Sequence, residues 1–464
     1  MKKIITTIFL AYSMGFYVSA QTSAFFADSL QYIIEQQANE NGFIGFSAAA
    51  IFPDGSIWQG ATGMAADGVT LDSSMIFNIA SVSKNMLATL ILKLEEEGSL
   101  NLNDSVGMYV SPFPHVDGNI TIRQLLNHTS GLSDLEETAA YEAAIFDDLT
   151  YQWPAEELLN NFQNTPLGPP GSPYEYSNSN YILLVPVAEA ATGKTLENLF
   201  REKIFEPLDM MHTWSGGFET PSAEMGGLWA DFNGDGSLDD LSTFPLVSFL
   251  SSDIGAGHIL SKPSDMVQYA QTIYEGEFLS ENSLLQMLEP AAGSAVPPFT
   301  VGYGLGTQIL DLNGHPFVGH EGASIQSSLL YYNPVDHFGV ALCTNHLNDL
   351  TLPFLNLISY IGPNLGIVPT DENNKGVNVN TFVFPNPFSY FLNFEINSAD
   401  NAPVILEIYD QLGKQIFSHQ SDIGNHHLIQ WDGNDLRNQS VSSGVYFYRI
   451  KKGGEILNGI LQKI

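Results

Sequence analysis

The sequence contains few basic residues and a single cysteine. Lys and Arg total 16 against 51 acidic residues, which gives a formal net charge of -35 at pH 7. A surface of this sign repels phosphate backbones and argues against nucleic acid as a partner. The single cysteine, Cys343, cannot form an internal disulfide, and the apolar run that precedes it predicts a small buried residue in a strand.

Long apolar runs are also absent once the N-terminus is passed. The apolar stretch from Ile4 to Val18 follows Lys2 and Lys3, and Val18-Ser19-Ala20 has the small-x-small pattern of a cleavage site. Residues 1–20 are therefore predicted to be a signal peptide. An uncleaved anchor is the alternative, but the stretch is short and interrupted by polar residues. We expect an exported mature chain with no transmembrane segment.

The remaining composition is that of a globular protein, with 44% hydrophobic and 14% charged residues over 464 positions. Mixed helical and strand patterns extend over residues 21–365. A polar linker is predicted at 366–379. Residues 380–464 contain several short alternating segments, such as Leu392–Ile396, and predict a small all-β sandwich.

Ser81 and Lys84 lie at the start of a predicted amphipathic helix. Residues three apart share a helix face, so the two side chains should lie side by side. A serine hydroxyl becomes a useful nucleophile when a neighbouring group takes its proton, and a shielded lysine can help in this. By itself Ser-x-x-Lys is also expected by chance in a chain of this length.

Two more motifs follow in chain order. Tyr176-Ser177-Asn178 lies on a loop before an apolar helix, and His320-Glu321-Gly322 lies between two predicted strands. Tyr331-Tyr332-Asn333 and His337-Phe338-Gly339 fit the same short patterns. These two flank a later hairpin turn and do not come in the right order.

Two other segments have both a functional and a structural interpretation. His128, beside two hydroxyl residues, fits a turn that ties down the backbone better than a catalytic role. Asp231–Asp240 has the oxygen spacing of a calcium loop, but its twelfth position is Ser242 in place of a bidentate glutamate. A solvated hairpin tip explains the Asn-Gly-Asp-Gly core of this segment equally well.

Together, the three motifs resemble those of the penicillin-recognising serine hydrolases, in particular the class C β-lactamase and D-alanyl-D-alanine carboxypeptidase branch. The resemblance covers about residues 25 to 362. It implies an α/β (α+β) fold with an antiparallel sheet flanked by helices and a helical subdomain. No cofactor or metal ion is expected.

The resemblance also implies a role for each residue of the motifs. Ser81 would form an acyl-enzyme, and Lys84 and Tyr176 would transfer protons, with the identity of the base left open. The substrate would contact Asn178, His320, Gly322 and Ala323. Asn178 would orient the substrate amide and Lys84, and the backbone N–H groups of Ser81 and Ala323 would stabilise the oxyanion.

His320 and Glu321 depart from the family pattern. Lysine is most common at the position of His320, although His-x-Gly also occurs within the family, and a small hydroxyl residue is usual at that of Glu321. A histidine is mostly neutral at neutral pH, and Glu321 adds a negative charge. Both changes make the binding of a substrate carboxylate less favourable. We therefore expect D-amino-acid peptides, small esters or related amides as substrates. A β-lactamase, or a catalytically weak binding protein on the same fold, is the alternative.

The tail resembles a type IX secretion C-terminal sorting domain, as found in Bacteroidetes. It implies the type IX machinery as a partner, and a secreted or outer-membrane cell-surface location reached through the periplasm. A carbohydrate-binding β-sandwich is the alternative. The resemblance rests on Phe384-Pro385-Asn386-Pro387-Phe388, Ile408-Tyr409-Asp410-Gln411-Leu412-Gly413-Lys414, Trp431-Asp432-Gly433 and Gly444-Val445-Tyr446-Phe447-Tyr448.

Overall fold

The computed structural model describes residues 24–296, 299–312, 314–365, 379–384, 391–398, 402–409, 414–424, 426–437, 439–442, 444–452 and 455–463. The predicted signal peptide and residues 366–378 of the predicted linker lie outside these ranges. Within them, no helix combines the length and the apolar character needed to cross a bilayer.

The chain divides into two compact units, one ending at Leu350 and one beginning at Thr351. By this division α12 (Thr351–Asn364) belongs to the second unit. The predicted domain boundary at residue 365 stays a prediction.

The first unit is built on one eight-stranded sheet whose neighbouring strands are antiparallel. Its first two strands in the sequence form a hairpin that turns at Pro53–Ser56, where the proline and glycine of Pro-Asp-Gly-Ser favour a turn. Among the strands of this sheet, the one that contains Cys343 comes last in the sequence. It pairs with the first strand of this hairpin. The sheet order is β3 (Val69–Thr70), β2 (Ile57–Ala66), β1 (Gly45–Ile51), β13 (Phe338–Thr344), β12 (Ser327–Asn333), β11 (His315–Ala323), β10 (Gln308–Leu312) and β9 (Thr300–Tyr303).

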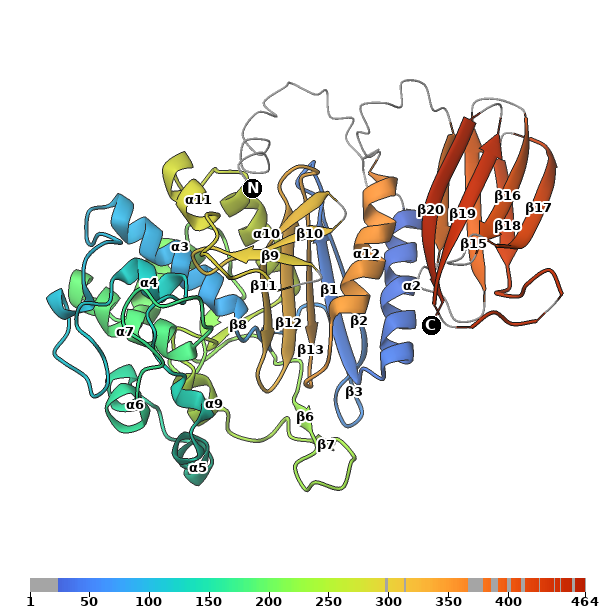
Figure 1. The fold of residues 1–464 in the computed structure, drawn as a ribbon. Helices are drawn as coiled ribbons and strands as arrows, with labels where there is room; N and C mark the ends of the chain where they lie inside the picture. The colour runs from blue at the N-terminus through green and yellow to red at the C-terminus, as the bar shows by residue number, and fades with distance from the viewer. Residues whose placement is uncertain are drawn as a thin grey trace. The chain divides into compact units, whose positions relative to one another are not determined.

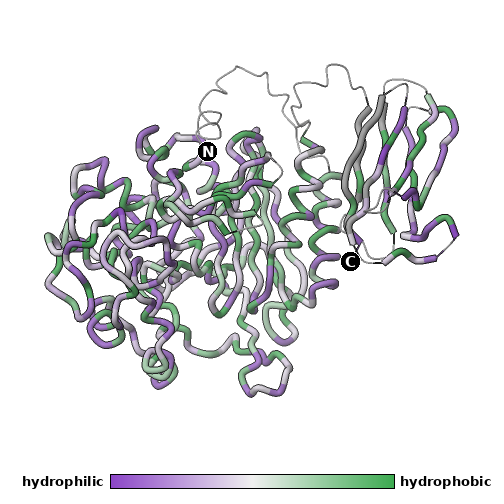
Figure 2. The backbone as a smooth tube through the Cα atoms, in the orientation of Figure 1, coloured by the Kyte–Doolittle hydropathy of each residue, from purple (hydrophilic) through white to green (hydrophobic). Residues whose placement is uncertain are grey.

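Helices cover both faces of this sheet. Figure 1 shows α2 (Ala24–Asn41) on one face, and α3 (Val82–Glu96) and α10 (Pro263–Tyr274) on the other. Every residue of β1, β12 and β13 is buried, because side chains on both faces meet a helix layer. Figure 2 accordingly shows hydrophobic residues along the central strands and mostly hydrophilic outer loops.

The segment between α3 and α10 forms the predicted helical subdomain. Its α4 (Ile122–Leu126) begins with a capping box in which Thr121 accepts from the backbone N–H of Gln124. The other helical elements of this segment are η1 (Val106–Met108), η2 (Leu135–Glu137), α5 (Ala139–Asp147), α6 (Ala155–Phe162), α7 (Asn178–Thr192), α8 (Leu196–Phe200), η3 (Arg201–Phe205) and α9 (Val247–Ser252), and α11 (Glu281–Met287) follows α10.

Two small sheets complete the first unit. In the first, β8 (Ile259–Ser261) pairs with both β4 (Phe77–Asn78) and β5 (Trp214–Ser215). Because β4 ends three residues before Ser81, this sheet fixes the approach to α3. The second sheet is a hairpin of β6 (Trp229–Ala230) and β7 (Asp239–Asp240), which encloses the Asp231 loop.

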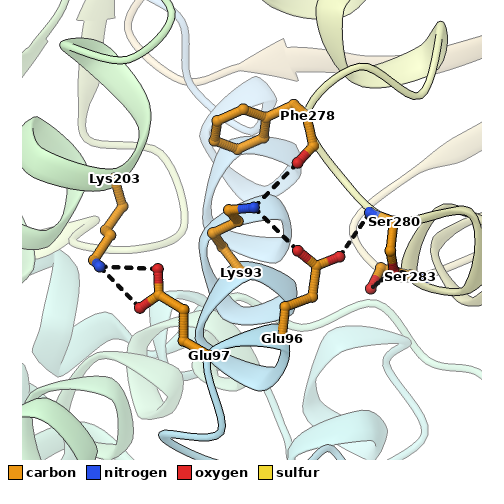
Figure 3. A network of polar contacts seen from close by, with 7 residues as sticks. All are labelled: Lys93, Glu96, Glu97, Lys203, Phe278, Ser280 and Ser283. Atoms are coloured by element: carbon orange, nitrogen blue, oxygen red, sulfur yellow. Dashed lines mark hydrogen bonds and ion pairs between the residues drawn. The ribbon is translucent and has the colours of Figure 1, made fainter.

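Helix α3 is buried along most of its length and is held by polar contacts at its C-terminal end. Lys93 Nζ donates to Glu96 Oε2 at 3.1 Å and to the carbonyl of Phe278 at 3.1 Å (Figure 3). Glu96 also accepts from the N–H of Ser280 at 2.7 Å. Lys203 reaches Glu97 at 2.8 Å. These contacts fix the helix whose other end carries Ser81.

The second unit contains the predicted all-β sandwich. One sheet has the order β14 (Val379–Phe384), β15 (Leu392–Ser398), β18 (His426–Trp431), and the other β17 (Gln415–Ile423), β16 (Pro403–Tyr409), β19 (Gly444–Lys452), β20 (Glu455–Lys463). Alternate residues of β16, including Val404, Leu406 and Ile408, enter a common core with Phe394 and Trp431. The fold class predicted from the sequence is therefore confirmed for both parts.

Candidate active site

Ser81 lies at the N-cap of α3, directly after a strained backbone position. Ala80 has a φ of 43°, a left-handed conformation that residues with a Cβ rarely adopt. The backbone before it is held by Asn78, whose N–H donates to Gln326 Oε1 at 2.6 Å and whose side-chain amide donates to the carbonyl of Gly257 at 2.6 Å. The chain thus enters the helix along a fixed path with the serine at the turn.

Lys84 is fully buried one turn into α3 and points back at Ser81. Its Nζ donates to Ser81 Oγ at 2.9 Å and to the carbonyl of Ala256 at 2.9 Å. Burial lowers the pKa of Lys84, but the interactions with Tyr176, Asp253 and Glu136 together raise it by more, so the pKa is raised overall. Lys84 is therefore an ammonium at neutral pH in the resting protein.

Tyr176 also reaches Ser81 and lies next to Lys84, whose Nζ is 5.0 Å from the centre of its ring. Its hydroxyl donates to Ser81 Oγ at 2.9 Å. Burial raises the pKa of Tyr176, and the nearby Lys84 lowers it without cancelling the rise. Ser81 Oγ therefore lies within hydrogen-bonding distance of two groups that can exchange a proton with it, as nucleophilic catalysis by serine requires.

Asn178 begins α7 and is held by two carboxylates. Its Nδ2 donates to Asp134 Oδ2 at 3.1 Å and to Glu136 Oε2 at 3.0 Å. These bonds use both amide hydrogens of Asn178. The structure thus brings Asn178 to the site, but its amide nitrogen faces carboxylates instead of the predicted substrate amide. The role of Asn178 in binding substrate stays a prediction.

Glu136 and Asp253 form a buried pair of carboxyl groups near Lys84. They are hydrogen-bonded to each other, and Glu136 Oε1 and Asp253 Oδ1 have no other partner among the described residues. Burial raises the pKa of Asp253 to about 6 although Lys84 lowers it, and burial raises the pKa of Glu136 well above its usual value. Two facing carboxyl groups can bond only by sharing a proton, so the pair carries one negative charge near neutral pH.

Sequence reasoning did not identify this carboxyl pair. One signal was present, because Gly257 lies four residues after Asp253 in a glycine-rich segment. A Cβ on Gly257 would meet Asp253 Oδ2 at 1.8 Å, so this glycine leaves room for the carboxylate.

The third motif lies on β11, where His320 is buried and Glu321 is exposed. His320 Nε2 is 3.0 Å from the hydroxyl of Tyr303, and its Nδ1 is 2.5 Å from the carbonyl of Glu321. Burial and the charge of Lys84 lower the pKa of His320 to about 3, so the ring is neutral. Both ring nitrogens are engaged within the protein. The predicted contact of His320 with substrate stays a prediction.

Gly322 lies directly against the backbone that leads into Ser81. A Cβ at this position would be 2.4 Å from the carbonyl oxygen of Ile79, 2.6 Å from Ser328 Oγ and 3.0 Å from the nitrogen of Ser81. The glycine of the motif is therefore needed for the close approach of β11 to the start of α3. Ala323 follows as the last, exposed residue of β11.

His128 has more contacts in the site than the turn interpretation predicted. It does occupy a turn, with a φ of 56°. It also stacks on the ring of Tyr176, with centroids 4.4 Å apart and an interplanar angle of 29°. Tyr303, also missed by sequence reasoning, connects it to His320. The sequence signal for these contacts was the presence of a histidine and an aromatic residue, His128 and Tyr303, in segments that flank the motifs.

The Asp231 segment forms the predicted hairpin tip between β6 and β7. Asp231 accepts from the backbone N–H groups of Asp235 and Gly236, each at 3.0 Å, and Asn233 accepts from Asp235 at 2.9 Å. Its side-chain oxygens thus serve the loop itself. In the described part of the chain, no three His, Cys, Asp or Glu side chains are grouped so that they could hold a metal ion.

Comparisons with known proteins agree with this geometry. Penicillin-binding protein 4* of Bacillus subtilis is 27% identical over 278 residues, which are 58% of this chain and 60% of that protein. The D-alanyl-D-alanine-carboxypeptidase/endopeptidase AmpH of Escherichia coli is 29% identical over 219 residues, 46% of this chain and 52% of that protein. The chain thus spans between half and two thirds of the length of these relatives.

Among solved structures, D-amino acid amidase from Ochrobactrum anthropi SV3, complexed with D-phenylalanine, has a TM-score of 0.62 at 25% identity. The match covers 72% of this chain and 98% of the amidase.

Two family profiles match, one for each part of the chain. The secretion system C-terminal sorting domain matches residues 382–461, which indicates a secreted or cell-surface protein. The Beta-lactamase profile matches residues 30–354, a span that contains all three motifs and most of the chain. By its fold, its motifs and this match, the chain belongs to the Beta-lactamase family.

Proposed function

We propose that this protein is a secreted serine hydrolase that acts through an acyl-enzyme at Ser81. The observation that carries the proposal is the position of Ser81 Oγ, 2.9 Å from both Lys84 Nζ and Tyr176 Oη. Ser81 Oγ attacks the carbonyl carbon of an amide or ester. The leaving group departs with a proton, and water then releases the acid and restores the serine.

Proton transfer in this reaction belongs to Lys84 and Tyr176. The raised pKa of each means that the resting pair is an ammonium and a phenol. The pair must lose one proton before it can accept that of Ser81. Once it has done so, the neutral amine or the phenolate takes the serine proton, and Tyr176 returns it to the leaving group. The same groups activate water in the second step.

Oxyanion stabilisation is assigned to two backbone N–H groups. That of Ser81 lies at the start of α3, where the helix dipole also favours negative charge. The second is that of Ala323, at the end of β11, which Gly322 allows to approach Ser81. Asn178 and His320 complete the substrate side of the site.

The substrate class follows from the charges around the site. His320 is neutral, so the third motif offers no cation to a substrate carboxylate. Asp134 and the Glu136–Asp253 pair add negative charge around Asn178. Small esters, D-amino-acid amides and peptides that present no carboxylate next to the scissile bond fit this site better than penicillins do. The similarity to a D-amino acid amidase supports the same class.

Export is the second part of the proposal. The sorting-domain match supports delivery by the type IX secretion machinery, which would recognise the second unit. The predicted signal peptide would first bring the chain to the periplasm, and the final location would be the cell surface or the medium.

A substrate panel tests the proposal. The purified full chain should hydrolyse nitrophenyl esters and D-amino-acid amides faster than D-alanyl-D-alanine peptides or nitrocefin, as measured by kcat/KM. Ser81→Ala should abolish every activity. Turnover retained by that variant would contradict the mechanism, and a preference for nitrocefin would contradict the proposed substrate class.

A further inference from the structure

His128, Tyr303 and His320 form a continuous chain of hydrogen bonds beside Tyr176. His128 Nε2 is 3.2 Å from the hydroxyl of Tyr303, which is 3.0 Å from His320 Nε2. All three side chains are buried. They come from the turn after α4, from β9 and from β11, so the chain connects three separate elements around the site.

The direction of each hydrogen bond follows from the fixed donors at one end. The backbone N–H of Ser177 donates to His128 Nδ1 at 3.2 Å, so Nδ1 is an acceptor and the ring proton lies on Nε2. Nε2–H donates to Tyr303 Oη, and the Tyr303 hydroxyl donates to His320 Nε2. The proton of His320 is then on Nδ1, which donates to the carbonyl of Glu321 at 2.5 Å.

This pattern requires both histidines to be neutral, and their surroundings keep them so. Burial and the charge of Lys84 lower the pKa of His128 well below its usual value, and they lower that of His320 to about 3. The rings around His128 carry no charge at neutral pH either. The titratable groups that face His128 or His320 are Lys84, Tyr174, Tyr176, Tyr181 and Tyr303.

Tyr176 contacts this hydrogen-bonded row of side chains through its ring, and the backbone next to Tyr176 is bonded to the same row. The His128 ring stacks on Tyr176 at 4.4 Å, while the next residue, Ser177, is bonded to His128 Nδ1. Tyr303 lies nearly perpendicular to Tyr176, with centroids 6.2 Å apart. The side-chain hydroxyl of Tyr176 is left to face Ser81 Oγ and Lys84.

We propose that His128, Tyr303 and His320 act together as positioning residues that hold Tyr176 in place for proton transfer at Ser81. The inference rests on the proposed function, because it takes Tyr176 to be the group that exchanges a proton. It also gives His320 a role that lysine could not fill, since an ammonium has no lone pair to accept from Tyr303. In this protein His320 completes the support of Tyr176 and leaves the substrate carboxylate unbound.

Tyr303→Phe tests the proposal, because it deletes the central hydroxyl and keeps the ring. We expect kcat for a nitrophenyl ester to fall by about 10- to 100-fold, because Tyr176 is no longer held in line with Ser81. KM should change less than about two-fold, and the alkaline limb of the pH–kcat profile should shift. Rates are expressed per reactive Ser81, counted by titration with a fluorophosphonate.

Tyr269→Phe is the matched control. It also removes a fully buried hydroxyl with two neutral partners, Thr89 at 2.7 Å and Asn85 Oδ1 at 2.9 Å, but away from Tyr176. It should lower the melting temperature as much as Tyr303→Phe does, with kcat and the pH profile unchanged. Equal kcat and equal pH profiles for Tyr303→Phe and the wild-type protein would overturn the proposal.

His128→Asn provides a second line of evidence. The Asn side-chain oxygen can replace Nδ1 as acceptor for Ser177, but it cannot stack or reach Tyr303 as the imidazole does. It should therefore retain more activity than His128→Ala and less than the wild-type protein. If both variants matched the wild-type kcat, the proposal would fail. Loss of activity in Ser81→Ala separates this outcome from failure of the proposed function itself.

Discussion

At the scale of single residues, the proposed mechanism combines one nucleophile, Ser81, with two proton carriers, Lys84 and Tyr176, whose pKa values depend on each other. Lys84 is buried, and its interactions with Tyr176 and Asp253 support its ammonium form. A buried lysine next to fewer negative groups would be driven toward the neutral amine. In the resting protein, Lys84 and Tyr176 together therefore carry one proton more than in the state that can accept the proton of Ser81.

The pH dependence of activity follows from this excess proton. The pKa values of Lys84 and Tyr176 are both raised above 10.5 and 10.0, so the reactive fraction with one proton fewer grows as the pH rises below these values. We expect kcat/KM for an ester to increase between pH 6 and 9, approaching about tenfold per unit. Initial rates corrected for spontaneous hydrolysis give kcat/KM at each pH. A maximum of kcat/KM at or below pH 7 would contradict the prediction.

Gly322 supports a prediction about packing at the nucleophile. In Gly322→Ala the new Cβ would lie 2.4 Å from the carbonyl oxygen of Ile79, so β11 would have to move away from Ser81. We expect a loss of about 1–3 kcal/mol in the free energy of unfolding, measured by urea titration, together with a large fall in kcat.

Gly362→Ala is the control for this substitution. Its Cβ would meet nothing within 4 Å, and Gly362 lies in the helix α12. Alanine should leave kcat unchanged and alter stability by less than about 1 kcal/mol. Equal kcat for Gly322→Ala and wild type would show that the close approach of β11 does not matter for catalysis.

At the scale of elements, periodic patterns predicted more than single polar residues did. The helix after Ser81, the strand that contains Cys343 and the alternating strand that begins at Leu392 were all predicted, because each leaves a local signal. Ser81, Lys84 and Tyr176 could be connected because their spacing and order are specific to a family.

The rest of the site depends on contacts between distant segments, which one sequence does not reveal. Asp253 meets Glu136 across more than 100 residues, and Tyr303 joins His128 to His320. The Asn178 amide turns toward Asp134 and Glu136 because two carboxylates lie within reach. Gly257 near Asp253 and the rings that flank the motifs hint at the first two contacts, but no local pattern shows which residues are paired.

At the scale of the whole molecule, a Beta-lactamase family unit and a β-sandwich are joined in one chain. The formal charge of -35 suits a protein that must stay soluble after export. The two units have separate cores, so delivery and catalysis can be tested apart.

Removal of the sandwich should change location and spare the site. In a bacterium with an active type IX system, the full chain should reach the surface or the medium, and a chain ending at residue 365 should remain inside the outer membrane. Immunoblots of cell fractions measure this, and a strain without the secretion machinery is the control. Equal export of both chains would contradict the role of the sandwich.

The covalent intermediate at Ser81 is the central claim, and its direct measurement is intact-protein mass spectrometry after incubation with a fluorophosphonate. The wild-type chain should gain the mass of one phosphonyl group, and peptide mapping should place that group on Ser81. Ser81→Ala should gain none. An unmodified wild-type chain, or a modified group elsewhere, would contradict the account of this protein as a serine hydrolase.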